Sequence, residues 1–207
     1  MPGWHVLASP RRFPRSGRAP LVMRRPLGRI TEIPLPTGAF PHPHRASIQA
    51  ALLAALEDLK QSDAALLEED ASELSITHCL AVHIARYFPT WDVDIQYNRK
   101  GQGDITKRVP LPPAPRADES DWPSVFPDII VHHRRLPENL LAIEIKKTSS
   151  TRPLDHDHSK LKCYTDLPLA GGLGYDLGAL IVVGTSSEMT RTRVDAWYPS
   201  PSRDDAP

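Results

Sequence analysis

Two short apolar segments, residues 128–132 and 140–146, are separated by residues 134–139, which are typical of a turn. This pattern predicts an antiparallel hairpin, and it therefore requires a fold that contains a sheet. If the strands pair across a turn near residues 136–137, the numbers of opposite residues sum to about 272–274.

The hairpin brings polar side chains together. Asp128 falls opposite Glu144 or Lys146, and the even sum keeps all three on one face because strand side chains alternate. The apolar neighbours point to the opposite face, into the core, and they are Ile129, Val131, Leu141, Ile143 and Ile145.

This group has two chemical interpretations. Two neighbouring carboxylates repel each other unless a cation joins them, and oxygen ligands favour a hard ion such as Mg²⁺ or Mn²⁺. A lysine beside that ion can orient a water or stabilise negative charge on a phosphate, as metal-assisted phosphodiester hydrolysis requires. The alternative is a solvated strand face with weak ion pairing.

Further elements are expected on both sides of the hairpin. Apolar stripes at helical spacing and alternating or continuous apolar runs identify them. The expected helices cover residues 47–61, 71–88 and 157–166, and the expected strands cover residues 91–97, 179–184 and 194–198. The fold class is therefore α/β or α+β, with helices flanking a mixed central sheet.

Charge and proline content divide the chain. Residues 1–46 contain eight arginines, one acid and nine of the 22 prolines, so we expect a disordered arm that includes His42 and His44. The formal net charge of the chain is zero, so the remainder carries −7. The arm either attracts phosphates without sequence preference or is a dispensable tail. Residues 47–198 form the expected domain and residues 199–207 a polar tail, with a proline-rich loop over residues 110–127.

No membrane or secretory signal is recognisable. No apolar run approaches the roughly 20 residues that span a bilayer, and the N-terminus lacks the apolar segment of a signal peptide. The two cysteines are too few for a disulfide framework. These features predict a cytoplasmic protein without a membrane partner.

Pro127-Asp128, an apolar strand and Glu144-Ile145-Lys146 resemble the signature of the PD-(D/E)xK nuclease superfamily. The resemblance covers about residues 70–198 and points to a bacterial branch with no assigned substrate. It implies a restriction-endonuclease-like αβββαβ core. It also implies that Asp128, Glu144 and the Ile145 carbonyl bind Mg²⁺ or Mn²⁺, and that Lys146 assists the attacking water.

Two helical residues are further candidates. Glu73 lies within about 20° of Leu80 on a helical wheel, in line with the apolar stripe, where an unpaired charge is unfavourable. The resemblance makes Glu73 a metal ligand, whereas residues 70–73 also match a capping box with Glu73 at its third position. The resemblance also makes Lys160 a candidate for contacting the phosphate, and its alternative is a solvated lysine. Asp157 is expected to cap the third helix.

The predicted function is a Mg²⁺-dependent nuclease that acts on nucleic acid, and the resemblance implies DNA rather than RNA as the substrate. A domain carrying −7 holds a polyanion poorly, so the arm, a homodimer or an accessory protein partner is expected to contribute affinity. The alternative is a non-catalytic interaction or accessory subunit that retains the fold in a defence or repair complex.

Overall fold

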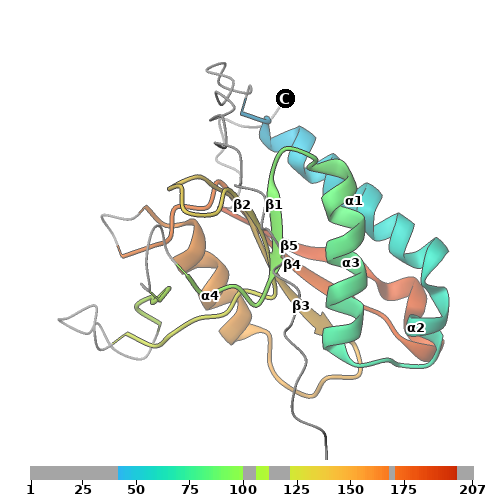
Figure 1. Cartoon of the computed structure of the whole chain (residues 1–207). Helices are drawn as coiled ribbons and strands as arrows, with labels where there is room; N and C mark the ends of the chain where they lie inside the picture. Colours follow the sequence, from blue (N-terminus) through green and yellow to red (C-terminus); the bar gives the residue numbers. More distant parts are fainter. Residues whose placement is uncertain (1–41, 100–105, 112–121, 168–170, 200–207) are drawn as a thin grey trace, which may run out of the picture. The chain divides into compact units, whose positions relative to one another are not determined.

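The computed structural model describes residues 42–99, 106–111, 122–167 and 171–199 (Figure 1). Its helices and strands form an α+β fold with one mixed five-stranded sheet. In chain order they are α1 (Arg45–Ser62), α2 (Ala64–Glu68), α3 (Glu73–Tyr87), β1 (Asp92–Ile95), β2 (Ile129–His132), β3 (Asn139–Lys147), α4 (Asp155–Thr165), β4 (Leu177–Val183), the 3₁₀ helix η3 (Ser186–Arg191) and β5 (Arg193–Tyr198). No helix in this part of the chain is long and apolar enough to cross a bilayer.

The strands lie in the sheet in their chain order, β1-β2-β3-β4-β5. Neighbours are antiparallel except β3 and β4, which are parallel. Parallel strands need a crossover rather than a tight turn, and α4 is part of the connection between these two.

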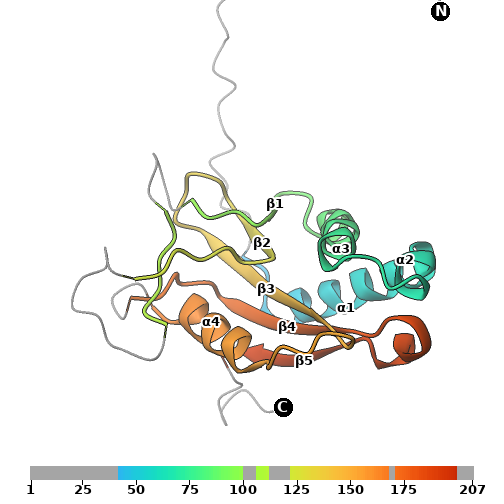
Figure 2. The same ribbon diagram turned by 90° about the horizontal axis from the view of Figure 1, so that it is seen from below.

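Two apolar layers cover the two faces of the sheet. Figures 1 and 2 show α1, α2 and α3 on one side of the sheet and α4 on the other. The first layer buries the alternate residues Ile129, Ile143 and Ile181 against the three N-terminal helices. The second buries Ala142 and Leu180 with residues of α4. The face that carries Glu144 is therefore covered by a helix.

The predicted hairpin register is confirmed over most of its length. Ile129 pairs with Ile143, and the next two pairs keep the same sum of 272. An irregularity between Val131 and His132 then shifts the register. Asp128 directly precedes β2 and therefore falls opposite Glu144.

The predicted helices are confirmed with small shifts at their ends, whereas α2 and η3 were not expected. The strand expected over residues 91–97 ends at Ile95. The next residue, Gln96, has φ of 48°, a left-handed conformation that interrupts extended backbone.

The two described ends of the proline-rich loop pair with each other. Arg108 and Ser124 form an isolated antiparallel bridge, and the Val125 N–H donates to the Lys107 carbonyl at 3.0 Å. Residues 112–121, which complete the predicted loop, lie outside the described residues.

The predicted boundary of the arm at residue 46 is wrong. Helix α1 already begins at Arg45, whose guanidinium donates to the Pro199 carbonyl at 2.8 Å. His42 lies 3.1 Å from an Asp176 carboxylate oxygen and packs edge-on against Trp91. These contacts tie residues 42–46 to the domain, while residues 1–41 of the predicted arm and residues 200–207 of the predicted tail lie outside the described part.

Candidate active site

Asp128 is held against the backbone of β3. Its Oδ2 accepts a hydrogen bond from the Ile145 N–H at 2.8 Å. Ile145 lies two residues past Ile143, which forms the last β2–β3 pair with Ile129, so its N–H has no partner from β2 itself. The carboxylate thus takes the place of a strand partner, next to the Glu144–Lys146 segment.

Glu144 is buried between β3 and α4, with only 1% of its surface exposed. Its Oε2 lies 2.5 Å from Lys160 Nζ, and its Oε1 accepts from the Tyr164 hydroxyl at 3.0 Å. Lys160 and Tyr164 are four residues apart, so they share one face of α4. The alternative of a solvated lysine is wrong, because the Lys160 side chain is only 15% exposed, and its contact with the phosphate stays a prediction.

Lys146 lies between two further acids. Its Nζ is 3.9 Å from Glu73 Oε1 and 3.6 Å from Asp157 Oδ2. Glu73 belongs to α3 and Asp157 to α4, which pack against opposite faces of the sheet. Lys146 therefore links side chains from both layers near the end of β3.

The capping box predicted for α3 is wrong. Ser72 is the N-cap and accepts from the Ser75 N–H, so Glu73 is the first helical residue. Asp70 instead has φ of 51° and binds Lys147 Nζ at 2.9 Å. Glu73 is therefore free of a capping role and turns toward Lys146.

Asp157 belongs to this group of side chains, which the sequence interpretation missed. The N-cap of α4 is Leu154, so the predicted capping role of Asp157 is wrong. Asp157 is only 5% exposed, and its Oδ1 lies 3.7 Å from Lys160 Nζ. Its signal in the sequence is the spacing to Lys160 and Tyr164, which places all three on one helical face.

Burial controls the protonation of the two central acids. It raises the pKa of Asp128, while the Ile145 N–H and Lys160 oppose this shift. Burial raises the pKa of Glu144 to about 8, and the Asp128 charge adds to the effect. Both acids are therefore easier to protonate than exposed carboxylates are.

Lys160 and Glu144 titrate together. Burial alone would lower the pKa of Lys160, but the Glu144 carboxylate raises it above its ordinary value. Because they share a hydrogen bond, their protons leave in steps that belong to the pair. Despite this contact the pKa of Glu144 is raised, since its side chain is almost fully withdrawn from water.

The site gathers four carboxylates, Glu73, Asp128, Glu144 and Asp157, around two ammonium groups, Lys146 and Lys160. Within the described residues, no three acidic, histidine or cysteine side chains are arranged to hold a metal ion. Lys160 lies directly on the Glu144 carboxylate. A cation could reach this carboxylate only if the ammonium moved aside.

His132 lies outside this group, at the opposite end of β2 from Asp128. Its Nε2 lies 2.9 Å from Asp94 Oδ2, and Arg134 also binds Asp94. The extra residue at the Val131/His132 irregularity belongs to β3, so the alternation of β2 is intact and His132 shares a face with Asp94, Ile130 and Asp128. His132 is thus part of a separate ion-pair network on β1 and β2.

Comparison with family models, curated proteins and solved structures gave no match to this chain. The geometry of the acidic cluster is therefore the basis for a functional assignment.

Proposed function

We propose that the protein is a divalent-metal-dependent phosphodiesterase that hydrolyses nucleic acid, with DNA favoured over RNA, on a restriction-endonuclease-like core. The observation that carries this proposal is the meeting of Asp128, Glu144 and Lys146 beside Glu73 and Asp157. These residues come from separate parts of the chain. When all four acids are ionised, they outnumber the two lysines, and an added cation would compensate the excess negative charge.

The donor set suits Mg²⁺ or Mn²⁺. Asp128 and Glu144 offer carboxylate oxygens, which hard cations prefer. In an extended strand the N–H and C=O of a residue lie on the same side. The Ile145 N–H meets Asp128, so the Ile145 carbonyl is expected on that side as a third oxygen. Glu73 is the candidate for a ligand from α3.

The ion would supply a lowered pKa for a bound water and neutralise charge on the phosphate. Lys146, held between Glu73 and Asp157, is placed to orient the attacking water and to offset charge that develops on the phosphate. Lys160 is bound to Glu144 in the metal-free arrangement. Its ammonium would become free to contact the phosphate if a cation replaced it on that carboxylate.

Cleavage of DNA and RNA in Mg²⁺ tests this proposal with wild type, Lys146→Ala and Asp128→Asn. Loss of a positioned group of this kind lowers rates by about 10²–10⁴-fold. Lys162→Ala is the matched control, because Lys162 lies on α4 but is exposed. Equal activity in wild type and both site variants would show a contaminating enzyme and contradict the proposal.

A non-catalytic accessory subunit is the second candidate. The Lys160–Glu144 contact favours it, as does the finding that no three acidic, histidine or cysteine side chains of the described residues are arranged to hold a metal ion. In this case the lysines would serve as permanent counter-ions for the buried acids. Cleavage would then be absent, and the protein would not bind Mg²⁺ or Mn²⁺.

A further inference from the structure

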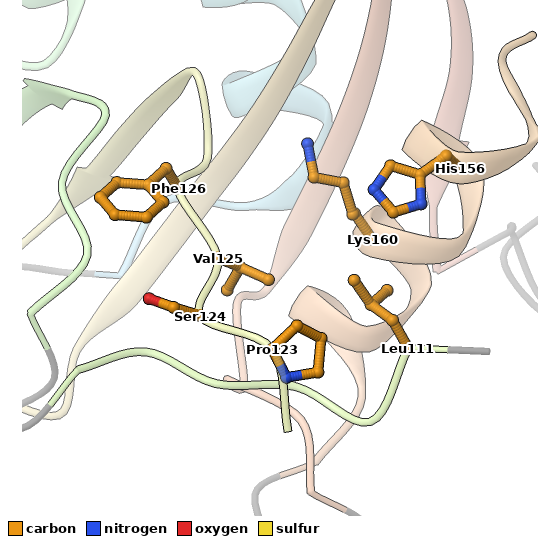
Figure 3. Close-up of a pocket in the computed structure, with 7 residues that line it drawn as sticks. All are labelled: Leu111, Pro123, Ser124, Val125, Phe126, His156 and Lys160. Atoms are coloured by element: carbon orange, nitrogen blue, oxygen red, sulfur yellow. The ribbon is translucent and has the colours of Figure 1, made fainter. Parts of the chain in front are cut away.

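A pocket adjoins the acidic cluster on the α4 side of the sheet. It has a volume of about 350 Å³, at the lower end of the roughly 300–1,000 Å³ typical of small-ligand sites. Figure 3 shows Phe126 on one side of it and Lys160 and His156, from α4, on the other. Leu111, Pro123, Ser124 and Val125 complete its lining.

The lining combines an aromatic face with cationic and polar groups. Phe126 is 49% exposed, while its neighbours Val125 and Pro127 are buried. An exposed aromatic ring beside a lysine suits a flat, partly polar ligand that is attached to an anion. A nucleobase with its phosphate has this chemistry, because every base offers a face for stacking.

The pocket is continuous with the candidate active site. Lys160 lines the pocket and also touches Glu144. Phe126 is two residues before Asp128 in the chain, so the ring and the carboxylate are placed by the same short segment. A base held here would lie next to a phosphate held by the acidic cluster.

We propose that this pocket receives an unpaired nucleobase of the nucleotide adjoining the phosphate to be cleaved, with Phe126 stacking on it. The preferred substrate class is then single-stranded nucleic acid, because bases inside a duplex are already stacked and must be flipped out. This inference rests on the proposed function and specifies its substrate.

Equilibrium binding of a short fluorescent single strand, and of a duplex of the same sequence, tests the pocket with the full chain in Ca²⁺. Wild type is expected to prefer the single strand. Phe126→Ala is expected to weaken single-strand binding by about 10-fold and to leave duplex binding unchanged. Phe126→Trp is expected to retain affinity. Leu136→Ala, an exposed site on the turn between β2 and β3, is the matched control.

A second measurement does not depend on the folding of any variant. In a series of single strands, one nucleotide at a time is replaced by an abasic nucleotide. Binding to wild type should weaken when the abasic nucleotide occupies one particular position, by a factor similar to that expected for Phe126→Ala.

The outcomes separate the two proposals. If wild type cleaves in Mg²⁺ but Phe126→Ala binds single strand and duplex as wild type does, or loses both equally, the pocket assignment is wrong and the hydrolase remains. If no abasic position weakens binding, the pocket assignment is also wrong. If wild type neither cleaves nor binds nucleic acid, the hydrolase proposal fails, and the pocket assignment fails with it.

Discussion

Glu144 is an acid in surroundings that favour its neutral form. Its pKa is raised from 4.5 to about 8, mainly by burial. Between these values the folded state keeps a proton that the unfolded chain has lost. By linkage, the free energy of unfolding must fall as pH rises through this interval.

Glu144→Gln should flatten that pH dependence in metal-free protein. The amide has nearly the same shape and does not titrate; its oxygen can accept from Lys160, and its NH₂ can donate to the Tyr164 hydroxyl oxygen. Urea unfolding in the presence of a chelator, at pH values across the interval, measures the effect. The same slope in wild type and variant would show that Glu144 does not titrate in this range.

Lys107 is a buried base whose shift has the opposite sign. It is 2% exposed, and its Nζ donates to the Tyr175 hydroxyl at 2.7 Å. Burial lowers its pKa from 10.5 to about 7. Between these values the unfolded chain binds the extra proton, so stability should rise with pH.

Lys107→Met should remove this rise, because the thioether fills much of the same space without a charge. The variant is expected to be more stable than wild type at pH values below the pKa of folded Lys107. Thermal unfolding at pH values from below about 7 up to 10.5 measures both effects, with the exposed Lys162→Met as control. A rise with pH that persists in Lys107→Met would assign it to another group.

At the level of residues, the sequence predicted what alternation and spacing determine. Glu144 and Lys146 share a face because any extended strand alternates, and Asp128 joins them through the hairpin register. Asp157 was not recognisable as a member of the site. Its place depends on how α4 docks against the end of β3, which is tertiary information.

At the level of elements, the N-terminus of α3 positions Glu73. Ser72 Oγ accepts from the Ser75 N–H at 3.1 Å and satisfies one of the free donors of the first turn. This cap fixes the residue at which the helix starts, and therefore the direction in which Glu73 leaves the backbone.

Ser72→Ala should lower the free energy of unfolding by about 1 kcal/mol, since the cap is lost. Chemical denaturation measures the change. Ser62→Ala, at the exposed last residue of α1, is the control, because alanine favours helix there. A Ser72→Ala variant as stable as wild type would mean that another group caps α3.

Long periodic elements were predictable, and short ones were not. The stripes that defined α1 and α3 extend over several turns, so their existence was clear and only their ends shifted. Helix α2 has five residues, too few for a periodic signal. The pairing of Lys107 with Val125 bridges a long stretch of chain and has no local signature.

At the level of the whole molecule, the mixed sheet explains why the acidic cluster is half-buried. The parallel pairing of β3 and β4 places α4 over the Glu144 face. The antiparallel partner β2 begins at Ile129, one residue after Asp128, which leaves the end of β3 open to that carboxylate. The sequence predicted the hairpin and the buried strand over residues 179–184, but the docking of α3 and α4 that brings Glu73 and Asp157 to Lys146 was visible only in the fold.

Calorimetric titration with Mn²⁺ tests the central claim, that these acids together hold a divalent cation. Wild type is expected to bind Mn²⁺, and Asp128→Asn is expected to lose this binding. Asp155→Asn, an exposed acid on α4, is expected to retain it. No binding by wild type, or equal binding by wild type and Asp128→Asn, would contradict the account.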